Sequence, residues 1–184
     1  KEQETLPKIL GRNGYKTAIV GKWHLGSPPQ GFDYWNILPG YGDYYNPDFI
    51  KMGKDTTYQG YVTDITTDLA LSWLDSNANR KEPFFLMIHQ KAPHRTQMPP
   101  VKYLDLFNEK EFVFPGTFYD DYKDKAALQR NKISIANDLW IDYDSKVACD
   151  TCLAYKMNIS KPVYYNNVMR RLNPEERKLW DKSY

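Results

Sequence analysis

The chain has 184 residues, of which 41% are hydrophobic and 26% charged, and its formal net charge is +2. This composition fits a globular chain with a modest core, and the small net charge gives no bias toward nucleic acid or a membrane. No run approaches the roughly 18 consecutive apolar residues of a membrane span. The 15 tyrosines and 5 tryptophans suit sugar-binding clefts and ordinary cores equally well, so composition alone leaves both open.

The first elements are a helix expected over residues 5–13 and a strand over residues 15–21. Thr5 is a suitable N-cap for this helix and Gly14 a suitable stop, and the short apolar, largely β-branched run before Gly21 is too brief for a helix. Lys22 and His24 follow at the carboxyl end of the strand, where open α/β sheets bind ligands. Taken alone, they could equally be a surface lysine and a structural histidine.

Residues 25–58 are rich in Gly, Pro and Tyr and are expected to form one long loop, which at this length is usually functional or disordered. Residues 61–77 predict an amphipathic helix that starts at Thr63 or Asp64. Its apolar positions are Ile65, Leu69, Leu71, Trp73 and Leu74.

Residues 84–88 form an uninterrupted apolar run, as expected of a strand buried on both faces. Residues 92–120 are expected to be a loop, and two further helices are expected over residues 126–146 and 173–184. The first of these has apolar positions at Ile133, Ile135, Leu139, Trp140 and Tyr143, and the second starts with Asn-Pro-Glu-Glu. Strands that alternate with helices predict an α/β fold with a largely parallel sheet.

Three stretches resemble the formylglycine-dependent sulfatases. Residues 14–26 read GYKTAIVGKWHLG and closely resemble the second signature of that family, while residues 5–14 resemble the helix that precedes it. Residues 83–94 read PFFLMIHQKAPH and resemble the family's next strand and its sulfate-binding histidine loop. The matches run from about residue 3 to residue 148, and the nearest resemblance is to bacterial-type glycosaminoglycan and N-acetylglucosamine-6-sulfatases. The resemblance implies an alkaline-phosphatase-like α/β/α sandwich.

The resemblance also implies catalytic roles for Lys22, His24 and His94. In the resembled mechanism a formylglycine hydrate attacks the sulfur, the alcohol leaves, and the sulfated hemiacetal then collapses. Lys22 would contact the hydrate and the sulfate, His24 would remove the hydrate proton during collapse, and His94 would bind a sulfate oxygen and help to protonate the leaving oxygen. An imidazole suits these roles because its pKa lies near neutrality.

Further candidates for contact with the substrate are Lys91, Asp43, Tyr45 and Asn46. Lys91 has a Lys-x-x-His spacing found in relatives, and the tract 40–47 resembles a stretch of sulfatases that act on amino-sugar 6-sulfates. The alternative for this tract is a turn packed by its own tyrosines. For His89 we favour a structural hydrogen bond, and for the neighbouring Arg95 a surface salt bridge.

The Cys/Ser-x-Pro-x-Arg stretch that matures to formylglycine does not occur in the chain, nor do the family's calcium-binding acidic pairs. Residues 1–184 are therefore interpreted as a partial sulfatase catalytic domain, with the nucleophile and the calcium ligands outside it. The resemblance implies an exported enzyme (periplasmic, extracellular or lysosomal) for a sulfated carbohydrate, matured by a formylglycine-generating or sulfatase-maturing enzyme. Cys149 and Cys152 lack a second pair for a zinc site, so we favour a local disulfide or two free thiols.

Two other functions remain open at this point. A phosphodiesterase or phosphonate hydrolase of the same superfamily shares the sheet and part of the active site. A non-catalytic relative that binds sulfated glycans would keep the lysine and histidine cations without the nucleophile, because function resides in the site and not in the fold.

Overall fold

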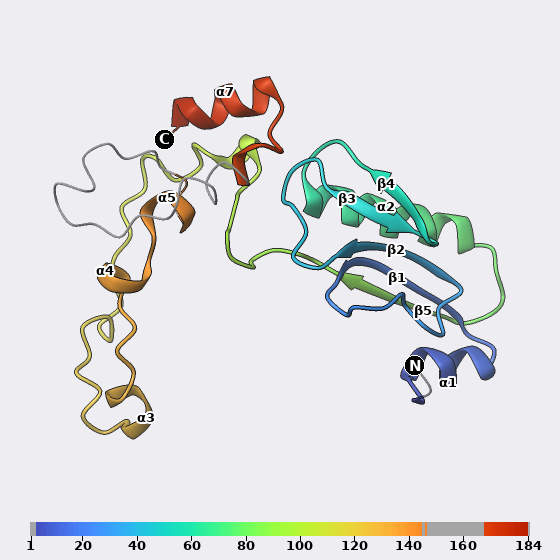
Figure 1. Ribbon diagram of the computed structural model, residues 1–184. Helices are drawn as coiled ribbons and strands as arrows, with labels where there is room; N and C mark the ends of the chain where they lie inside the picture. Colours follow the sequence, from blue (N-terminus) through green and yellow to red (C-terminus); the bar gives the residue numbers. More distant parts are fainter. Residues whose placement is uncertain (1–2, 145, 147–167, 184) are drawn as a thin grey trace. The chain divides into compact units, whose positions relative to one another are not determined.

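A computed structural model describes residues 3–144, 146 and 168–183 (Figure 1). The chain divides into two compact units, Lys1–His94 and Arg95–Tyr184. Cys149 and Cys152 lie outside the described residues. The part of the chain that is described contains no helix long and apolar enough to cross a membrane.

The first unit is built on a five-stranded sheet (Figure 1). Its elements are α1 (Leu6–Arg12), β1 (Lys16–Trp23), β2 (Tyr34–Pro39), β3 (Asp48–Lys51), β4 (Lys54–Thr57), α2 (Val62–Asn77) and β5 (Phe84–His89). The strand order is β4-β3-β2-β1-β5. Strand β1 pairs in parallel with β2 and with β5, whereas β2–β3 and β3–β4 pair antiparallel.

The expected long loop over residues 25–58 is wrong, because it contains β2, β3 and β4. Strand β2 buries Ile37 and Leu38 beside β1, and β3 and β4 form a hairpin whose two-residue turn is Met52-Gly53. Both turn residues have positive φ, 47° and 86°, as a tight hairpin turn requires. Methionine is an unusual residue at such a position, which hides the turn in the sequence. The α/β class is confirmed, but the hairpin makes the sheet mixed rather than largely parallel.

Strand β1 is the centre of this unit. Ala18, Ile19 and Val20 are fully buried, as the apolar run predicts. Strand β5 was expected to be buried on both faces, and this is wrong for the described structure. There β5 pairs with β1 alone, at the edge of the sheet, and Phe84 and Ile88 are 52% and 46% exposed.

Helices α1 and α2 cover opposite faces of the sheet. The Trp73 ring of α2 lies 5.7 Å from the Phe84 ring, whereas Pro7 of α1 lines a hollow together with Met87. Phe84 and Met87 are three positions apart on β5, and successive strand residues point to opposite faces. The α/β/α layering is therefore present in this unit.

Helix α2 starts earlier than expected, with Tyr61 at the N-cap position. Its buried residues are Val62, Ile65, Thr66, Ala70 and Trp73. Leu71, expected on the apolar face, is 51% exposed. In α1, Thr5 occupies the predicted N-cap position, although its side chain makes no capping hydrogen bond.

The second unit contains short helices: η1 (Val101–Tyr103), α3 (Ala126–Gln129), α4 (Ile135–Asp138) and α5 (Ile141–Asp144). The single helix expected over residues 126–146 is wrong. Asn131 Oδ1 accepts a hydrogen bond from the Ile133 amide, and Ser134 Oγ accepts one from the Asn137 amide. These local bonds compete with a continuous helix and start α4 anew. Ile133 and Ile135 consequently lie 75% and 68% exposed.

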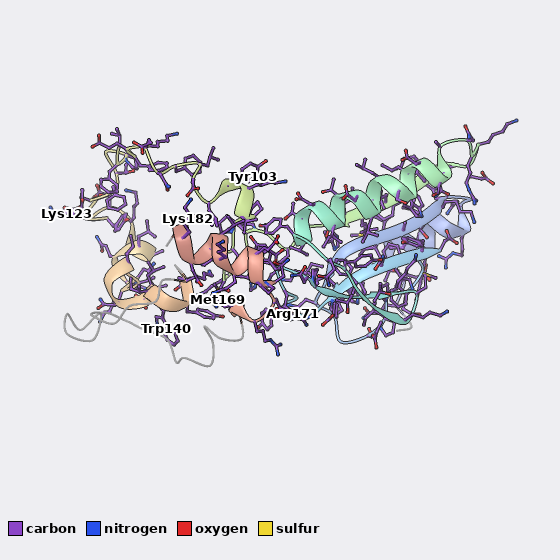
Figure 2. The ribbon with its side chains drawn as sticks, turned by 90° about the horizontal axis from the view of Figure 1, so that it is seen from above. Tyr103, Lys123, Trp140, Met169, Arg171 and Lys182 are labelled. Atoms are coloured by element: carbon purple, nitrogen blue, oxygen red, sulfur yellow. The ribbon has the colours of Figure 1, made fainter. Side chains whose placement is uncertain are left out.

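Helix α7 (Pro174–Ser183) confirms the predicted start of the last helix. The Glu176 amide donates to Asn173 Oδ1 (2.9 Å) and the Asn173 amide donates to Glu176 Oε2 (2.8 Å), which is a reciprocal capping box. Trp180 on this helix is 1% exposed. Figure 2 labels Lys182 in the last turn of α7 and Tyr103 in η1, the element that α7 contacts within this unit.

Candidate active site

The candidate site lies at the carboxyl ends of the three parallel strands. Strand β1 ends just before His24, β2 ends just before the segment 41–44, and β5 ends just before the segment 91–94. Because these strands run in the same direction, all three endings meet at one edge of the sheet. Strand β1 has β2 on one side and β5 on the other, which is the arrangement at which open α/β sheets form a ligand crevice.

Tyr41 is the residue on which the predicted catalytic side chains converge. Its ring centroid lies 4.6 Å from that of His24 and 5.5 Å from that of His94, and Lys22 Nζ lies 5.9 Å from it. Tyr41 is 66% exposed, and both histidines are exposed as well. The structure therefore brings Lys22, His24 and His94 together at a surface open to a ligand, although 70 residues separate the two imidazoles.

Tyr41 is a site residue that the sequence reasoning missed. It lies between Gly40 and Gly42, which have positive φ values of 60° and 64°. An aromatic residue flanked by two glycines directly after a parallel strand is the signal that could have identified it, because glycine tolerates the backbone turn that exposes the ring.

Lys91 lies beneath this surface. It is 5% exposed, its Nζ donates to the Tyr41 carbonyl oxygen (2.9 Å), and it lies 4.5 Å from the centroid of the Tyr44 ring. Burial, and then the positive charge of Lys22, lower the pKa of Lys91 to about 8, while Asp43 acts in the opposite direction. Lys91 is thus a buried cation that contacts the residues of the site from the protein interior.

Tyr44 joins the two segments that carry the site. Its hydroxyl donates to the carbonyl oxygen of His94 (2.7 Å), and its side chain is almost fully buried. Burial, with a smaller contribution from Tyr61, raises the pKa of Tyr44 to about 12. The sequence analysis considered this tyrosine only as a member of the tract 40–47.

The other residues of the tract 40–47 divide by burial. Asp43 is half-buried and close enough to Lys91 to affect its pKa. Tyr45 is 2% exposed with its ring 5.4 Å from Tyr61, and Asn46 Oδ1 accepts a hydrogen bond from the Gly60 amide (2.7 Å). Tyr45 and Asn46 thus contact the residues that directly precede α2.

His89 links the ends of two strands. Its Nδ1 lies 3.2 Å from the Lys22 carbonyl oxygen, which bears out the structural hydrogen bond favoured for it. Next to it, a hollow of about 490 Å³ is lined by Lys22, His24, Ile88, His89 and Gln90. Two of the three catalytic candidates therefore face a space that can accept a ligand group.

Arg95 belongs to the second unit, where it forms a bidentate ion pair with Asp144. Its Nε lies 2.5 Å from Oδ1 and its terminal nitrogen 2.7 Å from Oδ2. The guanidinium also lies 5.1 Å from the Tyr143 ring centroid. The expected salt bridge is confirmed.

The site as a whole combines two lysines, two exposed imidazoles and one carboxylate. Its local charge is positive, so it attracts an anion, and an imidazole is a side chain that can donate or accept a proton. Among the described residues, no group of three or more His, Cys, Asp or Glu side chains is placed to hold a metal ion. This arrangement can bind an anionic ester and move a proton to or from it.

Comparisons with known proteins find a matching family, similar sequences and similar solved structures. The family model described as Sulfatase matches residues 1–170. The chain is 42% identical over its whole length to an N-acetylglucosamine-6-O-sulfatase of Bacteroides thetaiotaomicron, of which it covers 33%. It is 32% identical to the human N-acetylglucosamine-6-sulfatase over 64% of its own length and 25% of that protein.

A solved structure is similar over the full chain. BT4656, in complex with its substrate D-glucosamine-2-N,6-O-disulfate, matches with a TM-score of 0.82 and 41% identity, and the chain covers 37% of it. The chain thus spans about a third of the length of these relatives. Because the family model matches nearly all of its residues, the chain belongs to the sulfatase family.

Proposed function

We propose that the protein containing this chain hydrolyses the sulfate ester of a sulfated sugar, with a 6-O-sulfated amino sugar as its substrate. The observation that carries this proposal is the convergence of Lys22, His24 and His94 around Tyr41 at the carboxyl ends of β1, β2 and β5. Relatives named as 6-sulfatases of N-acetylglucosamine, and a similar solved structure in complex with D-glucosamine-2-N,6-O-disulfate, support the substrate class.

In this proposal each side chain answers one electrostatic demand of the reaction. Lys22 supplies a fixed positive charge to a sulfate oxygen. Negative charge then develops on the sugar oxygen as its bond to sulfur breaks, and the His94 imidazolium donates a proton to that oxygen. His24 acts as a base and accepts a proton that the reaction must remove from a hydroxyl group. A positioned proton donor or acceptor contributes about 10²- to 10⁴-fold to rate.

Formylglycine, which supplies the nucleophile in this family, has no matching residue here, because the chain has no Cys/Ser-x-Pro-x-Arg stretch. Calcium is likewise assigned to no described residue. The proposal therefore places both groups on parts of the protein outside this chain. It also includes export of the protein and its maturation by a formylglycine-generating enzyme, which the family membership supports.

The proposal is tested by measuring inorganic sulfate released by the full-length protein. Expected substrates are N-acetylglucosamine 6-sulfate and glucosamine N,6-disulfate, and the matched negative control is glucosamine N-sulfate, which lacks the 6-sulfate. Hydrolysis of a phosphodiester to a phosphomonoester and an alcohol, without any sulfate release, would favour the phosphodiesterase alternative. Tight binding of sulfated sugar without turnover would favour the glycan-binding alternative.

Site-directed variants tie the activity to the described site. We expect Lys22→Ala and His24→Ala to abolish most of the sulfate release. Lys81→Ala is the matched control, because Lys81 is an exposed lysine outside the site. Equal activity of Lys22→Ala and Lys81→Ala would show that the site lies elsewhere.

A further inference from the structure

We propose that Lys91 and Tyr44 are positioning residues that together hold Tyr41 against His24 and His94, and that neither of them contacts the substrate. This inference rests on the proposed function, because it concerns the residues around the same site. It changes the role of Lys91 from a sulfate or sugar ligand to an internal tether.

Two hydrogen bonds, one made by Lys91 and one by Tyr44, join segment 41–44 to segment 91–94, and we call this pair of bonds the latch. Lys91 Nζ donates to the Tyr41 carbonyl oxygen (2.9 Å), and the Tyr44 hydroxyl donates to the His94 carbonyl oxygen (2.7 Å). Lys91, the first residue of segment 91–94, is thereby bonded to Tyr41, the first residue of segment 41–44. His94 and Tyr44, the last residues of the two segments, are bonded to each other. Each tie joins positions 50 apart in the sequence.

The two ties also contact each other. Lys91 Nζ lies 4.5 Å from the Tyr44 ring centroid, within the range in which an aromatic face attracts a cation. A carbonyl oxygen and a ring face are both electron-rich, so they favour an ammonium at this position. The nearby Asp43 adds a favourable charge, whereas Lys22 adds an unfavourable one.

Burial separates the latch from the surface that meets the substrate. Lys91 and Tyr44 are 5% and 4% exposed, whereas Tyr41 is 66% exposed. Tyr41 lies between two glycines of positive φ, so its own backbone supplies little restraint. The tether from Lys91 therefore supplies the restraint that keeps the Tyr41 ring beside both imidazoles.

The kinetic test compares wild type, Lys91→Met, Tyr44→Phe and the double variant in the full-length protein. A displacement of about 1 Å in a site can cost about 10²-fold in rate. We expect each single variant to lower kcat by about ten-fold or more, with the inhibition constant of inorganic sulfate changed by less than about two-fold. Because both residues act on one element, we expect the double variant to be no slower than the slower single variant.

The opposite pattern overturns the latch. If Lys91 binds the sulfate directly, Lys91→Met raises the inhibition constant of inorganic sulfate and KM together, and Tyr44→Phe does not. Multiplicative losses in the double variant would likewise show two independent roles. Tyr44→Phe removes a single oxygen atom, so it carries the test alone should Lys91→Met fail to fold.

A second readout does not depend on activity. The readout is the NMR signal of ¹³C-labelled histidine in the full-length protein, where the Tyr41 ring current shifts the imidazole signals of His24 and His94. His89 serves as the internal reference, because its ring contacts the Lys22 carbonyl oxygen instead. We expect both variants to move the His24 and His94 signals more than the His89 signal. Unchanged signals would overturn the latch, whereas absent sulfate release by wild type would refute only the proposed function.

Discussion

His24 and His94 differ from Lys91 in exposure, and this difference decides what each can do. The two imidazoles are exposed and share one tyrosine ring, so they can meet a substrate. Lys91 is buried against the Tyr41 carbonyl oxygen and the Tyr44 ring, so its charge acts on these protein groups. At the scale of single residues, the site has a reactive surface and a separate supporting residue beneath it.

Replacing His94 by alanine tests the proposed acid role. We expect a loss of about 10²- to 10⁴-fold in kcat/KM on sugar sulfates, because the leaving sugar oxygen then lacks its proton donor. The loss should be smaller on aryl sulfates with acidic phenols, whose leaving oxygens need little protonation. Steady-state kinetics on both substrate classes check this. Equal losses on both would leave sulfate binding as the only role of His94.

The lowered pKa of Lys91 predicts a dependence of stability on pH. The pKa falls from an ordinary value of 10.5 to about 8 in the folded chain, so between these values the unfolded chain binds more protons. The free energy of unfolding due to Lys91 therefore rises as pH rises from about 8 toward 10.5. One pKa unit corresponds to about 1.4 kcal/mol, so the total gain stays below about 3.5 kcal/mol.

Urea denaturation of wild type and Lys91→Met between pH 7 and pH 9.5 measures this gain. The range stops below pH 10 because of Tyr44, which faces Lys91. The pKa of Tyr44 is raised from 10.0 to about 12 in the folded chain, so above pH 10 this residue also makes the stability depend on pH. Lys22 and Asp43 are the other charged groups that act on Lys91. We expect the stability of wild type relative to the variant to increase above pH 8, and a difference independent of pH would contradict the burial of this charge.

At the scale of elements, the close approach of β1 and β5 positions the site. Gly21 pairs with His89 in the parallel register, directly before Lys22. A Cβ atom added at Gly21 would lie 2.1 Å from the His89 carbonyl oxygen and 2.9 Å from Thr66 Cγ2, and the residue has a φ of 98°. Both the space and the backbone conformation therefore require glycine at the point where the strand ends and the site begins.

Replacing Gly21 by alanine is expected to destabilise the protein by about 3 kcal/mol or more, through the clash with backbone and the unfavourable φ. Gly26→Ala is the matched control, since Gly26 has no atom within 4 Å of an added Cβ and no positive φ. Thermal unfolding of the two variants tests this difference. Equal melting temperatures would show that β1 and β5 separate easily at this point.

At the scale of the whole molecule, the small net charge of +2 conceals a local arrangement. Lys22 and Lys91 lie at one edge of the sheet with Asp43 as their nearby counter-charge, so the surface around Tyr41 is positive although the chain is nearly neutral. The second unit has buried residues of its own, Met169, Leu172 and Trp180. The described residues supply cations and proton donors, and the sequence contains no nucleophile motif of this family.

The 184 residues expressed alone are therefore expected to show no hydrolysis of aryl sulfates, while full-length protein does. A fluorogenic aryl sulfate provides a sensitive measurement, and the Lys22→Ala variant of the chain controls for a contaminating enzyme. Turnover by the purified chain that disappears in this variant would show that these residues suffice for the reaction.

Short-range patterns in the sequence determined several features correctly, because their causes are local. The capping box at Asn173 depends on residues three positions apart, and the apolar run of β1 lies within a few residues. The long helix expected over residues 126–146 failed because hydrogen bonds made by Asn131 and Ser134 outweigh a weak apolar periodicity. The prediction of Lys22, His24 and His94 as catalytic residues came from family motifs, each contained in one continuous stretch.

Only the tertiary structure could decide the features that join distant residues. The short strands β2 to β4 are stabilised by pairing with one another and with β1, so the Gly- and Pro-rich sequence around them conceals them. Tyr41 meets His94, and Lys91 meets Tyr41, across about 50 positions, which no local pattern encodes. The sequence by itself predicted which reactive groups this protein carries, whereas the parallel pairing of β1 with β2 and β5 decided which side chains surround them. This is because only the pairing brings the three strand ends to one edge.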